Sequence, residues 1–198
     1  RRRHTRCLSD WSSDVCSSDL YMVLADSEIL LELERGMIVI SPFNQQYLNP
    51  NSVDLTLNPQ CKVYIGDLLD CRKPNPVEEF TIPEDGYVLH PGELYLYSCN
   101  ETVGVKEDIC ATVMGKSSLG RLGLDIHICA GFIDSGFVGS LVLEMRVVKP
   151  LRIYPNMKIC QIKFERVAGK ILQTYDKKPG SKYHGQSGVQ ESLMHKNF

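Results

Sequence analysis

The sequence predicts a mainly β protein, a sandwich, jelly roll or barrel built from many short strands. Short runs rich in β-branched and aromatic residues follow one another from residue 37 onward, separated by Pro, Gly, Asn or Asp. Helix-period segments of useful length are missing between these runs, so a sheet of alternating strands and helices is not expected. A chain of 198 residues with 43% hydrophobic and 23% charged residues can form one compact core.

The first residues, RRRHTRCLSDWSSDVCSSDL, do not resemble the rest of the chain. They begin with a basic flank but continue with Ser and Asp, where a secretory signal needs an apolar stretch. The repeated SSD units resemble a translated sequencing adapter. We therefore interpret residues 1–21 as a non-native extension, with Met22 as the natural start and Trp11 outside any functional role. A genuine disordered arm is the alternative.

The segment DSEILLELER predicts one short helix over residues 26–35. Ile29, Leu30 and Leu33 share one face of it. Asp26 is the expected N-cap and Gly36 the expected stop. We expect a β domain over residues 22–170 and a mobile, polar C-terminal segment, rich in lysine and glycine, over residues 171–198.

The run from Ser140 to Val148 alternates with period two, as a strand does. Leu141, Leu143, Met145 and Val147 fall on one face, and Glu144 falls on the other among apolar neighbours. Such a carboxylate is either paired with a cation, Arg146 or Arg121, or serves as a general base. A structural ion pair is the commoner of the two.

The sequence Gly115-Lys116-Ser117 resembles the end of a phosphate-binding P-loop. That motif needs glycine at position 110, where this chain has cysteine, so a P-loop is not predicted. If Ser117 begins a helical turn, its hydroxyl and the Arg121 guanidinium lie on one face. An N-cap serine and a solvated arginine are the alternative.

The segment AGFIDSGFVG predicts a tight turn bounded by glycines. Asp134 stands in this turn and Phe137 follows three residues later. A carboxylate and an aromatic ring in this arrangement suit the binding of a sugar hydroxyl and the face of its ring.

Composition excludes several classes of function. The 22 basic and 24 acidic residues give a formal net charge of -2, which argues against a general nucleic-acid coat. No apolar run is long enough for a membrane span, so we expect a soluble, cytoplasmic protein. The eight cysteines contain no C-x-x-C pair, which favours reduced, mostly buried thiols and no zinc site.

The H-x-E and P-C-x-x-C signature of zinc-dependent cytidine deaminases is also absent. His127 is therefore expected to be a packed or hydrogen-bonded residue and not a metal ligand.

Six ordered motifs give the chain a family resemblance from Met22 to its C-terminus. They are SVDLTL, HPGELYL, GKSSLGRLGL, AGFIDSGFVGSLVLE, MKICQIKFE and GSKYHGQSG. Together they resemble the dCTP deaminase and dUTPase superfamily. A glutamate ten residues after the turn aspartate marks the deaminase branch, and Glu144 stands ten residues after Asp134.

The resemblance implies deamination of dCTP to dUTP and ammonia without a catalytic metal, in a homotrimer with a distorted jelly-roll core. Glu144 would be the general base, with Ser117 and Arg121 orienting the water and the carboxylate. Ile128 and Ala130 would read the pyrimidine through their backbone, Asp134 the 3'-hydroxyl and Phe137 the deoxyribose. The residues implied to hold the triphosphate, with Mg²⁺ on its phosphates, are Lys116, Ser118, Gln161, Tyr175, Lys182 and Gln186. The active sites would lie between subunits, and residues 171–198 would form a flap over the phosphates.

Two departures from the family pattern bear on the reaction. Lys116 stands where many members have arginine. Lysine keeps the positive charge but cannot form the bidentate hydrogen bonds that arginine makes with a phosphate. Gly131 and Gln161 resemble the subgroup that also cleaves the triphosphate, so a bifunctional enzyme that forms dUMP is the alternative to the dUTP-forming one. A catalytically silent nucleotide-binding module on the same scaffold is a further alternative.

Overall fold

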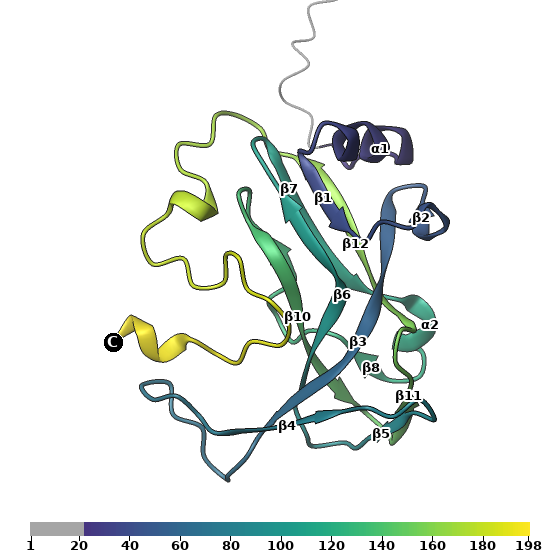
Figure 1. Cartoon of the computed structure of the whole chain (residues 1–198), viewed down its shortest axis with the longest axis vertical. Helices are drawn as coiled ribbons and strands as arrows, with labels where there is room; N and C mark the ends of the chain where they lie inside the picture. Colours follow the sequence, from purple (N-terminus) through teal and green to yellow (C-terminus); the bar gives the residue numbers. More distant parts are fainter. Residues whose placement is uncertain (1–21) are drawn as a thin grey trace, which may run out of the picture.

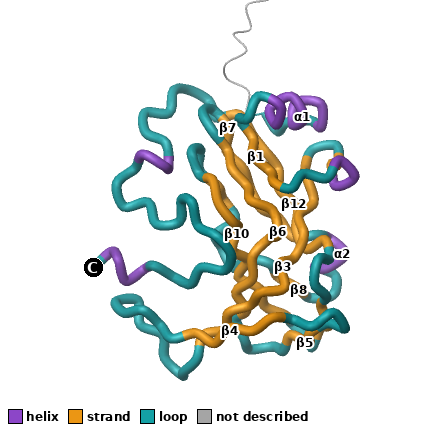
Figure 2. The backbone as a smooth tube through the Cα atoms, viewed as in Figure 1, coloured by secondary structure: helices purple, strands orange, loops and turns teal. Residues whose placement is uncertain are grey.

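The computed structural model describes residues 22–198, and it is mainly β as the sequence predicts (Figures 1 and 2). The interpretation of residues 1–21 lies outside the described residues. The strands are β1 (Ile38–Ser41), β2 (Leu48–Asn49), β3 (Ser52–Tyr64), β4 (Val77–Thr81), β5 (Tyr87–Leu89), β6 (Tyr95–Val105), β7 (Ile109–Gly115), β8 (Leu124–Asp125), β9 (Phe132–Ile133), β10 (Val138–Val147), β11 (Leu151–Ile153) and β12 (Lys158–Arg166).

The main sheet is antiparallel and follows the order β8-β10-β6-β3-β12-β7-β9. β1 adds to β6, β2 and β4 add to β3, and β5 pairs with β11 in a separate two-stranded sheet. The long strand β3 changes partner along its length, because residues 53–56 pair with β12 and residues 57–63 pair with β6. The sheet curls in this way around one core, in a distorted barrel-like arrangement.

Strand β10 has the two faces that its sequence predicts. Leu141, Leu143, Met145 and Val147 are all buried in the core. Val142 and Glu144 on the other face are half-buried, and Arg146 is exposed. The period-two pattern therefore assigned the inward face correctly.

The helices are short. α1 (Asp26–Glu34) is the predicted helix, and Gly36 follows its end with a φ of 71° that suits glycine. The expected N-cap, Asp26, is wrong: Ala25 holds the extended cap position, and Asp26 lies inside the first turn, where its carboxylate accepts a hydrogen bond from the N–H of Ser27. The remaining helical segments are α2 (Ser117–Gly120), η1 (Gln45–Tyr47), η2 (Tyr175–Lys177) and η3 (Met194–Asn197).

The C-terminal segment, residues 171–198, folds back over the start of β10 (Figure 1). The N–H of Gly185 donates to the carbonyl of Val138, and the N–H of Ser140 donates to the carbonyl of Gln186, at 2.7 and 2.9 Å. The amide of Gln186 donates back to the carbonyl of Ser140. These bonds dock the segment along one edge of the predicted strand.

The burial of the cysteines agrees with the prediction from the sequence. Cys61, Cys99, Cys110 and Cys160 are buried, and Cys71 and Cys129 are exposed. All six are free, as predicted for mostly buried, reduced cysteines. No helix within residues 22–198 has the length and apolar character needed to cross a membrane.

Candidate active site

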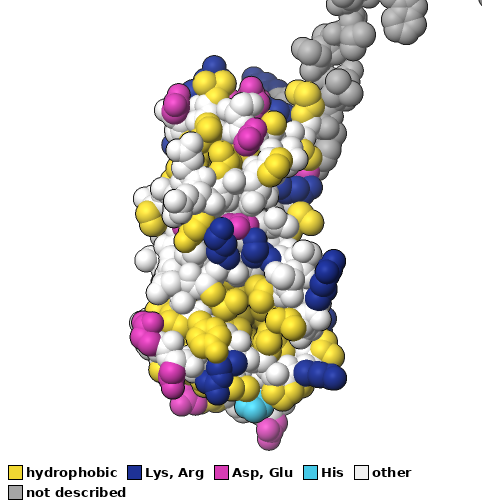
Figure 3. All heavy atoms as spheres, turned by 90° about the vertical axis from the view of Figure 1, so that its right-hand side faces the viewer, with side chains coloured by type: hydrophobic (Ala, Val, Ile, Leu, Met, Phe, Trp, Pro, Cys, Tyr) yellow, Lys and Arg dark blue, Asp and Glu magenta, His cyan; other side chains and the backbone are white. Residues whose placement is uncertain are grey.

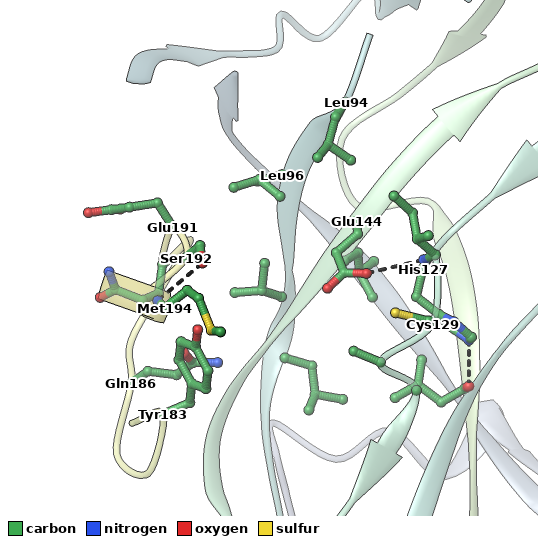
Figure 4. A pocket seen from close by; sticks show the side chains of 18 of the residues that line it. Leu94, Leu96, His127, Cys129, Glu144, Tyr183, Gln186, Glu191, Ser192 and Met194 are labelled. Atoms are coloured by element: carbon green, nitrogen blue, oxygen red, sulfur yellow. Dashed lines mark hydrogen bonds between the residues drawn. The ribbon is translucent and has the colours of Figure 1, made fainter. Parts of the chain in front are cut away.

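A cavity of about 610 Å³ opens beside β10. Glu144 and the loop 127–131 form one wall, and the C-terminal segment with Tyr183, Gln186 and Met194 forms the opposite wall (Figure 4). The implied site residues that line this cavity are Ile128, Ala130, Asp134, Phe137, Glu144, Tyr175 and Gln186. The fold thus gathers all four residues assigned to the nucleoside, together with Glu144.

Glu144 projects from β10 into this cavity and is half-buried. Its Oε2 accepts a hydrogen bond from the backbone N–H of Ile128 at 3.1 Å. The alternative of an ion pair with Arg146 is wrong, because that guanidinium is bound to Asp125 at 2.9 Å. Among residues 22–198 no cation pairs with Glu144, so its second oxygen is available to a ligand in the cavity.

The loop 127–131 is held tightly behind Glu144. Nε2 of His127 lies 3.0 Å from the carbonyl of Val113, which is the packed, hydrogen-bonded role predicted for this histidine. A Cβ at Gly131 would lie 2.9 Å from that same carbonyl and 2.9 Å from Nε2 of His127. Position 131 is therefore restricted to glycine by the close approach of backbone, not by its own dihedral angles.

The turn after this loop has the predicted form. The N–H of Phe137 donates to the carbonyl of Asp134 at 3.1 Å, and Gly136 has a φ of 90°, as the third residue of a type II turn requires. The Asp134 carboxylate is exposed at the cavity. The ring of Phe137 is only 7% exposed and packs edge-on against Tyr175, with ring centroids 5.9 Å apart.

The remaining implied residues do not line this cavity of the same chain. They are Lys116, Ser117, Ser118, Arg121, Gln161 and Lys182. Ser117 is the first residue of α2 and Arg121 its C-cap, and the N–H of Arg121 donates to the carbonyl of Ser117. The N-cap is Lys116, so the alternative of Ser117 as a capping serine is wrong. α2 lies on the far side of the molecule from the C-terminal segment (Figure 1).

A second group of polar side chains forms near α2. Nζ of Lys116 lies 2.6 Å from the carboxylate of Asp54. The amide oxygen of Gln161 accepts a hydrogen bond from Ser52 at 3.2 Å. The residues assigned to catalysis and to phosphates are therefore divided between two places on one chain.

Sequence analysis assigned no role to several residues that line the cavity. Tyr64, Leu69, Gln190 and Glu191 line the cavity from the end of β3, the loop after it and the C-terminal segment. The hydroxyl of Tyr64 accepts a hydrogen bond from the N–H of Ser192. Their positions depend on the path of the C-terminal segment, which no local pattern predicts.

Comparison with known proteins places the chain among nucleotide deaminases. A family model described as dCTP deaminase-like matches residues 23–167. A relative from Clostridium beijerinckii is 43% identical over 177 residues, covering 89% of this chain and 99% of the relative. A relative from Leptospira biflexa is 42% identical over 179 residues, covering 89% and 98%. Both bear the name "dCTP deaminase, dUMP-forming".

The fold has a counterpart among solved structures. The crystal structure of 2'-deoxycytidine 5'-triphosphate deaminase from Agrobacterium tumefaciens superposes with a TM-score of 0.60 at 21% identity. The match covers 74% of this chain but 48% of that one, so the chain spans about half the length of that protein. At this identity the likeness concerns the fold.

Proposed function

The chain belongs to the dCTP deaminase-like family, and on that premise we propose that it is a hydrolase that converts dCTP to dUMP, ammonia and pyrophosphate. The observation that carries the proposal is the Glu144 carboxylate, fixed by Ile128 at the wall of a nucleotide-sized cavity and ten residues after the Asp134 turn. The relatives named dUMP-forming favour this product over dUTP, which the motifs led us to expect first.

In the first step Glu144 takes a proton from water as that water attacks C4 of the cytosine ring. One proton of this water passes to N3 of the ring and the other to the exocyclic nitrogen, the C4–N bond breaks, and ammonia departs so that a uracil ring remains. The free oxygen of Glu144 is the atom that accepts the proton, since Oε2 is held by the N–H of Ile128. Ile128 and Ala130 line the same cavity, and we propose that their backbone groups recognise the pyrimidine edge.

The turn would bind the sugar. The exposed Asp134 carboxylate can accept a hydrogen bond from the 3'-hydroxyl. The buried ring of Phe137 is fixed by Tyr175, so it provides a rigid apolar wall for the deoxyribose. A rigid wall at this place disfavours a 2'-hydroxyl by lack of room.

In the second step water attacks the α-phosphorus of dUTP. The bond from this phosphorus to the oxygen that bridges the α- and β-phosphates breaks, so that pyrophosphate departs and dUMP remains. Lys116, Ser118, Gln161, Tyr175, Lys182 and Gln186 are proposed to hold the phosphates. Mg²⁺ bound to these phosphates would neutralise their charge. Among residues 22–198 no group of three His, Cys, Asp or Glu side chains is placed to hold a metal.

A complete site requires a second copy of the chain. Ser117 and Arg121 are exposed at α2 and do not line the cavity of Glu144. The surface around α2 also exposes Met114, Leu122 and Val148. Figure 3 shows hydrophobic side chains gathered on this face, with lysine and arginine side chains beside them. A homotrimer that brings α2 of one subunit to the cavity of the next would cover this surface and unite the two groups.

The experiment is to incubate the full chain with dCTP and Mg²⁺ and to measure nucleotide, ammonia and pyrophosphate together. We expect dUMP, ammonia and pyrophosphate in equal amounts. Accumulation of dUTP with ammonia and no pyrophosphate would show the dUTP-forming reaction instead. Absence of all three products, with dCTP still bound, would show the catalytically silent module.

A further inference from the structure

Two lysines share one buried carboxylate beside α2. Asp54 on β3 is 4% exposed. Its Oδ1 accepts hydrogen bonds from Nζ of Lys116 at 2.6 Å and from the amide of Asn49 at 3.1 Å. Its Oδ2 lies 3.2 Å from Nζ of Lys158, the first residue of β12. The family motifs assign Lys116 to the phosphates but give no role to Asp54 or Lys158.

This cluster carries an excess of positive charge. Burial raises the pKa of Asp54, but hydrogen bonds from Lys116, Lys158 and Asn49 outweigh burial and hold the pKa below its ordinary value of 3.8. The carboxylate is therefore ionised at neutral pH, and two ammonium groups against one carboxylate leave a net charge of +1. An anion is the ligand that such a cluster favours.

Both ammonium groups can still reach a ligand. The side chain of Lys116 is 24% exposed and that of Lys158 is 41% exposed. Each ammonium has three N–H donors, of which the ion pair with Asp54 uses one. The ammonium of Lys158 also lies 4.4 Å from the centre of the Tyr47 ring, a cation–π contact that holds it on the other side.

Neutral donors surround the two lysines. Gln161 lies directly opposite Asp54 in the register of β12 and β3. The exposed hydroxyls of Ser117 and Ser118 follow Lys116 along the chain. Two fixed cations beside hydroxyl and amide groups suit a ligand with several phosphates.

We infer that Lys158 is a further residue that binds the phosphates of the nucleotide and that Asp54 is a positioning residue that holds Lys158 and Lys116 at a fixed spacing. The inference rests on the proposed function for the identity of the ligand, a nucleoside triphosphate. A lysine side chain that is already ordered loses less conformational freedom when the phosphates bind. Two lysines held in this way also compensate in part for the arginine that many family members have at the position of Lys116.

The first test measures anion binding apart from any reaction. The full chain is titrated with inorganic tripolyphosphate in a calorimeter, and Lys158→Met is compared with Lys158→Arg and with Lys106→Met. Lys106 is an exposed lysine that precedes β7, at the opposite end of that strand from Lys116. We expect Lys158→Met to weaken tripolyphosphate binding about tenfold, with the other two variants within about twofold of the unaltered chain. Equal binding by Lys158→Met and the unaltered chain would overturn the inference.

The same variants separate binding from chemistry. Lys158→Met should raise the KM for dCTP about tenfold with little change in kcat, because the lysine contacts a part of the substrate that does not react in deamination. Lys158→Arg should restore the KM. A fall in kcat with an unchanged KM would contradict a role in binding.

Asp54→Asn tests the positioning role. Loss of its negative charge raises the net charge of the cluster, so charge alone predicts tighter tripolyphosphate binding. Loss of positioning predicts weaker binding, and we expect weaker binding by about threefold or more. Tighter or unchanged binding in a variant with a normal circular dichroism spectrum would overturn the role of Asp54. If Asp54→Asn does not fold, the Lys158 variants still test whether Lys158 binds the phosphates.

The outcomes distinguish this inference from the proposed function. Binding of tripolyphosphate that depends on Lys158, in a protein that releases no ammonia from dCTP, would support the phosphate site and contradict the deaminase. Release of ammonia with a KM that is insensitive to Lys158→Met would support the deaminase and contradict this inference.

Discussion

The backbone N–H of Ile128 and the carboxylate of Glu144 are joined by a hydrogen bond of 3.1 Å across the wall of the cavity. The bond links strand β10 to the loop 127–131, two segments that the chain order separates by the Asp134 turn. It fixes the direction of one carboxylate oxygen and leaves the other toward the cavity (Figure 4). The orientation of this carboxylate therefore depends on the loop as much as on the strand.

Glu144→Gln should abolish most deamination. The amide oxygen of glutamine can still accept the hydrogen bond from Ile128, but the side chain can no longer take a proton from water. A general base contributes about 10²–10⁴-fold, so ammonia release from dCTP should fall by that factor. The matched control is Glu84→Gln, at an exposed glutamate before β5. Full ammonia release by Glu144→Gln would remove the assignment.

Two inactive variants should restore activity when they are mixed. Glu144→Gln keeps α2 intact, and Arg121→Ala keeps Glu144 intact, so a site formed between two such chains can hold both groups. Equal mixing of the two, after dissociation and reassembly, should give about a quarter of the unaltered activity if every site joins two subunits. The measurement is ammonia release before and after exchange of subunits. Activity that stays at the level of the separate variants would show that each site uses one chain.

Gly131→Ala should disturb the loop behind Glu144. The added Cβ would lie 2.9 Å from the carbonyl of Val113, a backbone atom that cannot rotate away. Overpacking of this kind costs about 1–3 kcal/mol in the free energy of unfolding. Because the displaced loop carries Ile128, we also expect kcat to fall.

The control for that substitution is Gly120→Ala in α2. A Cβ at Gly120 meets nothing within 4 Å, and alanine is favoured in a helical turn. Thermal unfolding of both variants provides the comparison. A Gly131→Ala variant as stable as Gly120→Ala would show that the loop has room to move.

Acid should release the C-terminal segment from β3. Nζ of Lys62 lies 2.9 Å from Glu191 and 3.0 Å from Glu79. The hydrogen bond from Lys62 lowers the pKa of Glu191 from its ordinary value of 4.5. A lowered carboxyl pKa stabilises the docked segment above 4.5, and this contribution is lost as the pH falls through the lowered value.

Amide hydrogen exchange over residues 186–194 measures this release. After correction for the intrinsic rate, exchange should be faster at acid pH than at neutral pH. Glu191→Gln should show the faster exchange already at neutral pH, whereas Glu34→Gln, at the exposed end of α1, should not. Equal protection of the segment in the unaltered chain and in Glu191→Gln would contradict the role of this ion pair.

Local patterns predicted the parts of the structure that depend on neighbours in sequence. The alternation around Glu144 assigned both faces of β10, and the Asp134 turn has the expected hydrogen bond because its glycine supplies the positive φ. The stop of α1 at Gly36 is correct for the same reason. Its N-cap is not, because the chain enters the helix through Ala25, whose carbonyl accepts the N–H of Ile29.

The contacts that sequence reasoning missed join residues far apart in the chain. Glu32 is 1% exposed on a helix face where an acidic residue is usually solvated, and Arg166, on β12, pairs with it. Asp54 is buried in the same way between Lys116 and Lys158. Each of these two buried carboxylates is tolerated because a cation meets it, and that cation lies far from it in the sequence.

By itself the sequence determined that the chain is mainly β, which residues face the core and which family it belongs to, because alternation, turn glycines and ordered motifs are local in the chain. Only the tertiary structure decided that Glu144 lies at a cavity closed by the C-terminal segment, whereas Ser117 and Arg121 lie elsewhere on the same chain. The physical reason is that strand pairing and the docking of the last residues are set by contacts across the sheet, which the order of residues does not reveal.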